Sequence, residues 1–72
     1  MSSEDESISI SEWATAERVR ISDEAAAERV RISDGPGTLD EREALKRAVS
    51  EDEERRKQEI TDEEQRRKAA LD

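Results

Sequence analysis

Asp34-Gly35-Pro36-Gly37-Thr38 holds both glycines and the single proline of this 72-residue sequence. A cluster of such residues ends one element of secondary structure and begins another. Thr38 is followed three residues later by Glu41, which is the spacing of a helix-capping box and predicts a helix start near Leu39. The loop over 34–38 therefore divides the chain into a front half and a long C-terminal half.

The sequence after the loop predicts one long charged helix over 39–72. It lacks glycine and proline, and acidic residues stand four positions before basic ones, as in the pair Glu53 and Lys57. Each such pair stabilises an isolated helix by only about 0.3 kcal/mol, but several of them act together. Ser50 and Thr61 repeat the capping-box spacing, yet one continuous helix is favoured. Large apolar side chains are sparse after residue 50, so we expect this part to project into solvent or to pair with a partner.

The front half carries an 11-residue repeat, in which residues 11–21 are followed directly by residues 22–32. Most positions of the two units are identical, and each unit opens with Ser and closes on Ile. Acidic residues come early in each unit and basic residues come late, which is typical of a helical segment. Eleven residues also correspond to three helical turns.

Two interpretations of the front half are open. On a helix, the apolar residues form two stripes on nearly opposite sides, the first made of Ala14, Ile21, Ala25 and Ile32 and the second of Ala16, Val19, Ala26, Ala27 and Val30. A bend near Ile21-Ser22 would turn both stripes toward one interior. This predicts an all-α fold, with a short helix-bend-helix pair over 11–33 packed on the long C-terminal helix and a flexible acidic N-terminus over 1–10.

The alternative interpretation is an α+β fold with three short strands. Apolar and polar residues alternate near 7–10, 18–22 and 29–33, as they do in half-buried strands. The segments between them carry no turn residue, which argues against tight hairpins.

Composition excludes several kinds of chemistry. Twenty-one acidic and 13 basic residues give a net charge of −8, which disfavours nucleic acid and anionic lipid as partners. The absence of cysteine and histidine predicts no metal site, no cofactor and no disulfide. No apolar run approaches the length of a membrane span, and the acidic N-terminus differs from a signal peptide. We expect a soluble, cytoplasmic or recombinant, non-enzymatic protein without a small-molecule substrate.

The larger apolar side chains are the candidate core or interface residues, because binding or self-association is the function that composition leaves open. They are Trp13, Val19, Ile21, Val30, Ile32, Leu45, Val49, Ile60 and Leu71. Trp13 is the single aromatic residue, and we interpret it as a core anchor, with an exposed hot spot for a partner as the alternative.

Two resemblances extend these expectations. Residues 13–32 resemble the helix-turn-helix of bacterial and archaeal regulators, with Ala16 where the helices cross, Ser22 as the cap of the recognition helix and Val30 as its anchor. This implies an acidic transcription regulator, and the low lysine content is similar to that of proteins from salt-loving microbes. The Glu-, Arg- and Ala-rich helices with regular caps instead resemble computationally designed small helical proteins, which implies a scaffold, interaction or self-assembly module. A third hypothesis is an antitoxin-like segment that folds on a basic partner.

Overall fold

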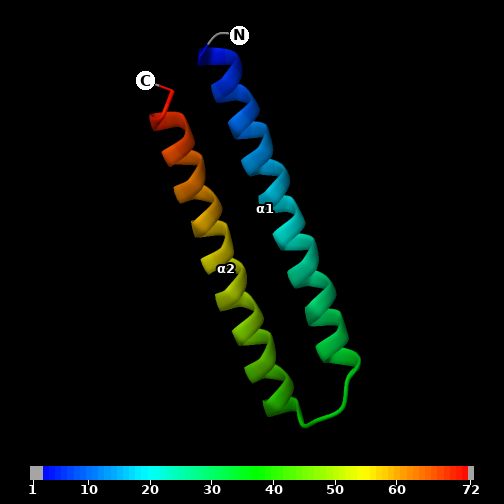
Figure 1. Ribbon diagram of the computed structural model, residues 1–72. Coiled ribbons are helices and arrows are strands. Elements are labelled where there is room, and N and C mark those ends of the chain that lie inside the picture. The colour runs from blue at the N-terminus through cyan, green and yellow to red at the C-terminus, as the bar shows by residue number, and fades with distance from the viewer. Residues whose placement is uncertain (1–2, 72) are drawn as a thin grey trace.

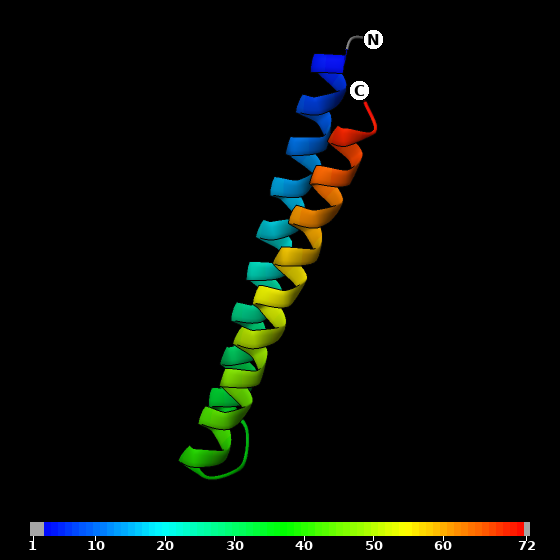
Figure 2. The same ribbon diagram turned by 90° about the vertical axis from the view of Figure 1, so that its left-hand side faces the viewer.

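Two long helices make up most of the chain in a computed structural model, which describes residues 3–71. Helix α1 covers Ser3–Asp34 and helix α2 covers Leu39–Ala69. The two helices lie side by side and antiparallel, with the connecting loop at one end of the molecule (Figure 1). The view in Figure 2 shows the same pairing from the side, and the hairpin measures 54 × 15 × 8 Å. The fold is all-α, as predicted.

The loop uses the turn chemistry that its sequence indicates. The backbone N–H of Gly35 bonds back to the last turn of α1 at 3.2 Å. Gly37 has a φ of 113°, a left-handed conformation that glycine adopts without strain. The hydroxyl of Thr38 then accepts a hydrogen bond from the N–H of Glu41 at 3.2 Å, so that α2 begins at Leu39 with its N-terminus capped.

The bend predicted near Ile21-Ser22 is absent, because α1 continues without interruption through both residues. No glycine or proline lies between residues 3 and 34, and the abundant Ala, Glu and Arg residues favour an unbroken helix. Residues 13–32, which resemble a helix-turn-helix, therefore contain no turn between two helices.

The strands of the alternative fold are also absent from the part of the chain that the structure describes. The segments 7–10, 18–22 and 29–33 all belong to α1. Their alternating apolar residues fall on different sides of a helix, so the alternation reflects the two stripes and not a pleated strand.

The helices differ in length from those of the predicted arrangement, because the first helix is longer than expected and pairs with the second along most of its length. We expected residues 1–10 to form a flexible segment; residues 3–10 are the first turns of α1, and residues 1–2 lie outside the part of the chain that the structure describes. Residues beyond 50, which we expected to project or to await a partner, lie along α1. The structure is thus a hairpin of two helices of nearly equal length, and α1 itself supplies the partner for the distal half of α2.

The core is a single stripe on α1. Ala14, Ile21 and Ala25 are 0%, 3% and 7% exposed, and Ile32, the fourth member of the predicted stripe, is half-buried. No residue of α2 is fully buried. Because two of the three buried side chains are alanines, the hairpin removes little apolar surface from water by its own folding.

Candidate protein interface

The predicted core and interface residues separate into three groups by exposure. Ile21 is buried. Half-buried residues are Trp13, Ile32, Val49, Ile60 and Leu71. Exposed residues are Val19, Val30 and Leu45, at 55%, 60% and 54%. The structure therefore divides the predicted set between residues that the hairpin covers at least in part and residues that it leaves to solvent.

Arg18 and Arg29 of α1, eleven residues apart, bind α2 in the same way. The Arg18 guanidinium lies 2.5 Å from a carboxylate oxygen of Glu64 and 3.2 Å from the hydroxyl of Thr61, and the Arg29 guanidinium lies 2.5 Å from Glu53 and 3.0 Å from the hydroxyl of Ser50. We call each set of three residues a cross-helix clamp. The two clamps fix the antiparallel register at two levels of the hairpin.

A lysine of α2 completes each clamp on the acidic side. The ammonium of Lys57 lies 3.0 Å from Glu53, and that of Lys68 lies 3.3 Å from Glu64. The hydrogen bonds from Arg29 and Lys57 hold the pKa of Glu53 below its usual value. Those from Arg18 and Lys68 lower the pKa of Glu64 in the same way. Each clamp is thus a carboxylate between two cations, one from each helix.

Two further contacts between the helices, each made by an arginine of α2, stand eleven residues apart along one edge of the hairpin. The guanidinium of Arg67 lies 4.0 Å from the centre of the Trp13 ring, a cation–π contact. Eleven residues further along α1 and eleven residues back along α2, Arg56 lies 2.9 Å from the carboxylate of Glu24. Trp13 is therefore held at the seam under an arginine, which agrees better with a packing anchor than with a free hot spot.

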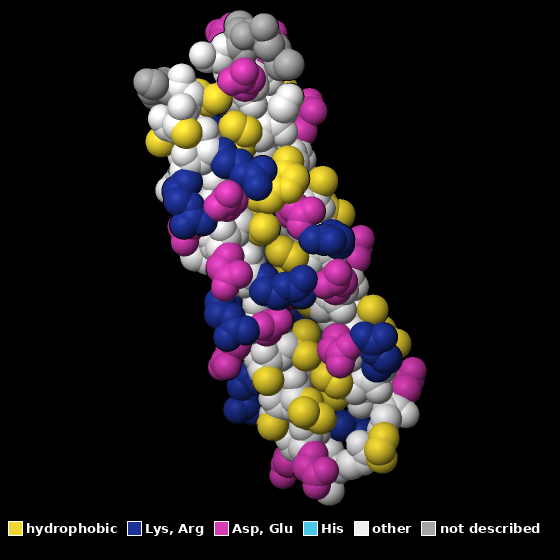
Figure 3. Space-filling model, viewed as in Figure 1, with side chains coloured by type: hydrophobic (Ala, Val, Ile, Leu, Met, Phe, Trp, Pro, Cys, Tyr) yellow, Lys and Arg dark blue, Asp and Glu magenta, His cyan; other side chains and the backbone are white. Residues whose placement is uncertain are grey.

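An apolar groove runs between the helices toward the loop. Its lining includes Ile32, Leu45 and Val49 together with the ion pair of Glu24 with Arg56. Figure 3 shows apolar side chains gathered along the seam, edged by charges of both signs. Within this groove Leu45 is 54% exposed, whereas Ile32 and Val49 are half-buried.

The second predicted stripe of α1 lies mostly on the side opposite to α2, and only Ala27 of its residues also lines the groove between the helices. Its aliphatic residues Val19 and Val30 are 55% and 60% exposed, and Ile8, which was not in the predicted stripe, extends it eleven residues before Val19 and is 57% exposed. Ala16, Ala26 and Ala27 lie between them and are exposed as well. We call this set of six residues the outer stripe.

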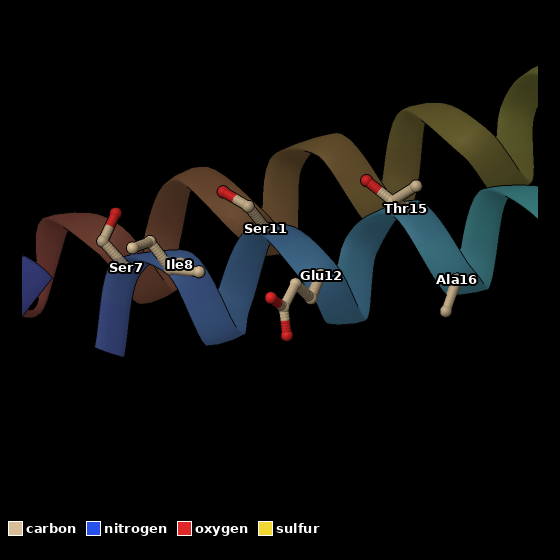
Figure 4. Close-up of a pocket in the computed structure, with 6 residues that line it drawn as sticks. All are labelled: Ser7, Ile8, Ser11, Glu12, Thr15 and Ala16. Atoms are coloured by element: carbon tan, nitrogen blue, oxygen red, sulfur yellow. The ribbon is translucent and has the colours of Figure 1, made fainter. Parts of the chain in front are cut away.

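A shallow hollow lies at the N-terminal part of the outer stripe. Ser11 and Thr15 form one edge of it and Glu12 and Ala16 the other, with Ile8 at one end (Figure 4). Residues 8, 11, 12 and 15 have the i, i+3, i+4, i+7 spacing of the four residues that receive a side chain in knobs-into-holes packing. The hollow therefore has the form of an unfilled helix-packing site.

Sequence reasoning did not include several of these residues in the candidate set. Ile8 was missed, although it precedes Val19 by the same eleven residues that separate Val19 from Val30. The four charged clamp residues, Arg18, Arg29, Glu53 and Glu64, were missed because charge pairs were sought only within one helix. Their eleven-residue spacing in both halves of the chain was the available signal.

The chain matches no protein-family model, no curated protein and no solved structure. Neither helix of residues 3–71 is long and apolar enough to cross a membrane. Within the same residues, no group of three or more acidic side chains is arranged to hold a metal ion. Inferences about function therefore rest on the geometry of the hairpin and its exposed surfaces.

Proposed function

We propose that this chain is a self-association module, a helical hairpin that binds a second copy of itself through the outer stripe of α1. The exposure of Ile8, Val19 and Val30 carries the proposal. Scattered apolar residues are normal on a protein surface, but these three aliphatic side chains recur every eleven residues on one side of α1, with exposed alanines between them. Such a face is typical of a helix that packs against another helix.

The small core supports the same proposal. Chains of this size bury little apolar surface and commonly gain stability from disulfides, metals or oligomerisation. Here the core consists of Ala14, Ile21 and Ala25, and the sequence has no cysteine. Association through the outer stripe would bury three aliphatic side chains from each copy, as many residues as the hairpin buries by itself.

Sedimentation equilibrium tests the proposal. We expect a mass of twice the 8.2 kDa chain for the wild type and a shift toward the monomer for Val19→Glu/Val30→Glu. Leu39→Glu is the matched control, since Leu39 is 72% exposed and lies outside the outer stripe, so this variant should remain dimeric. A folded wild-type monomer at high concentration would contradict the proposal. An unfolded monomer would favour instead a segment that folds on a basic partner.

A further inference from the structure

We infer that the apolar groove between the helices is a second interaction surface, and that it binds an amphipathic helix of another protein that carries aliphatic and basic side chains. The groove and the outer stripe share only Ala27, so binding in the groove does not depend on self-association. Three features of the groove support this: an interrupted repeat of contacts, an apolar lining and an excess of carboxylates.

The groove lies where the eleven-residue series of cross-helix contacts is interrupted. Arg67 and Arg56 of α2 stand eleven residues apart, and each lies against a side chain of α1. The next position of this series on α2 is Leu45, and the next position on α1 is Gly35, which directly follows the helix. A glycine offers no side chain as a cover, and Leu45 remains exposed.

Aliphatic side chains from both helices line the groove near the loop. Ile32 of α1 and Leu45 and Val49 of α2 are among them, and the small side chains of Ala27 and Ala48 lie beside them. Figure 3 shows these apolar side chains as a patch between the helices. An amphipathic helix that lays its apolar face into a groove of this kind is a common mode of recognition.

Carboxylates give the groove an excess of negative charge. Four acidic and two basic residues line it, and both arginines already bind a carboxylate of the same lining. The remaining acids, Asp52 and Glu53, bind cations that lie outside the lining. Two copies packed groove to groove would bring two acidic linings together, so charge complementarity favours a basic partner over a second copy.

Glu28 and Asp52 provide a position for a basic side chain of the partner. Both stand four residues nearer the loop than the ion pair of Glu24 with Arg56, which puts them at the same level of the two helices. Each carboxylate is about half-exposed and binds an exposed arginine of its own helix. Exposed pairs of this kind are weak, so a lysine or arginine from a partner can join or replace them.

The spacing on α2 gives the pattern expected of the partner. Asp52, Val49 and Leu45 stand at steps of three and four residues, so they lie along one face of α2 on successive turns. A partner helix would therefore carry a lysine or arginine with aliphatic side chains one and two turns away. The net charge of −8 also attracts a basic partner and repels an acidic one.

Binding of a labelled peptide tests the inference. The probe is a fluorescein-labelled peptide of leucine and lysine whose leucines form one face of a helix, and its fluorescence anisotropy is measured as the protein is added. A peptide of leucine and glutamate is the control for charge, and a peptide of alanine and lysine is the control for apolar contact. We expect the leucine–lysine peptide to bind at least about ten-fold more tightly than either control.

Variants of the aliphatic residues locate the site. We expect Leu45→Gln to weaken binding of the leucine–lysine peptide several-fold. Leu39→Gln should leave binding unchanged, because Leu39 is exposed but lies outside the groove. Val19→Gln/Val30→Gln in the outer stripe should bind as the wild type does. Circular dichroism checks that each variant remains helical.

Variants of the acidic residues separate the groove from the overall charge. Glu28→Gln/Asp52→Asn should weaken binding of the same peptide several-fold. Glu51→Gln/Glu54→Gln is the matched control, because it removes the same charge from exposed residues outside the groove and should have a much smaller effect.

Several outcomes would overturn the inference. Equal weakening by the two pairs of acid substitutions would mean that the net charge alone holds the peptide, and unchanged binding by Leu45→Gln would mean that it binds elsewhere. Loss of binding in Val19→Gln/Val30→Gln would place the peptide on the outer stripe. If Leu45→Gln abolished self-association and Val19→Gln/Val30→Gln did not, a second copy would occupy the groove, against both proposals. A wild-type monomer that binds the peptide in the groove would contradict only the proposed self-association.

Discussion

The guanidinium of Arg29 on α1 lies 2.5 Å from the carboxylate of Glu53 on α2, although 24 residues separate them in the sequence. The side chain of Glu53 is 15% exposed, so its carboxylate is mostly covered by its partners. The equivalent bond between Arg18 and Glu64 repeats this geometry one unit away. These charge pairs stand where a coiled coil of ordinary composition would place apolar residues, and they specify the register that a sparse apolar seam leaves weakly determined.

Removal of one clamp should destabilise the hairpin modestly. We expect a double-mutant cycle of Arg29→Gln and Glu53→Gln to give a coupling free energy of roughly 0.5 kcal/mol, since partly exposed ion pairs contribute little. Urea unfolding followed by circular dichroism at a fixed chain concentration measures it. The pair of Arg55 with Asp52, exposed and within one helix, is the control and should couple more weakly. Equal coupling in both cycles would show that the clamp has no special role.

The clamp carboxylates should make the free energy of unfolding decrease as the pH becomes acidic. The pKa of Glu53 is lowered in the folded chain, so its contribution is complete above the pKa of the unfolded chain and is lost as the pH falls through the folded value. The wild type should therefore be more stable than Glu53→Gln near about pH 7, and the difference should vanish toward about pH 2. Thermal melts across this range check it. Glu59→Gln is the control, because Glu59 forms no ion pair within residues 3–71.

Loss of the Arg67 side chain should expose Trp13 to water. We expect Arg67→Ala to shift the tryptophan emission to longer wavelength, to increase acrylamide quenching and to cost about 0.5 kcal/mol of stability. Arg66→Ala is a close control, since Arg66 and Arg67 both bind Glu63 but the Arg66 side chain is 72% exposed. Identical spectra for the two variants would contradict the cation–π contact.

Enlargement of the buried alanine at position 14 should force the helices apart. Ala14 is 0% exposed, so Ala14→Leu should destabilise the hairpin by about 2 kcal/mol, the usual cost of overpacking a close contact. Ala44→Leu makes the same change at an exposed position of α2 and should be neutral within about 0.5 kcal/mol. Urea midpoints compare the two variants, and an unchanged midpoint for Ala14→Leu would mean that the helices do not approach closely at this level.

The sequence predicts the loop, the cap and the core face well because each depends on local chemistry. Gly35 and Pro36 end one helix, Thr38 begins the next, and the stripe through Ile21 is the face that α2 covers. The prediction of a bend was wrong because it assumed that both stripes of α1 must be buried within one chain. A straight helix avoids that requirement by leaving Val19 exposed.

The hydroxyl residues of α2 show why the clamps were not predicted. Ser50 and Thr61 have capping-box spacing, which indicates helix starts when the sequence is considered one helix at a time. In the folded hairpin α2 passes through both residues without a break, and their hydroxyls accept hydrogen bonds from Arg29 and Arg18. Local spacing could not reveal this use, since the arginines come from the other helix.

The recurrence of the clamps makes the hairpin adjustable in length. Deletion of residues 22–32 together with residues 50–60 would remove one unit from each helix and shorten the hairpin by about 16 Å. Arg18 would still stand opposite Glu64, because the two deletions shift both helices by the same number of turns. Insertion of a matching pair of units would lengthen the hairpin by the same amount. The length of the hairpin can therefore change in steps of three helical turns while the helix register is kept.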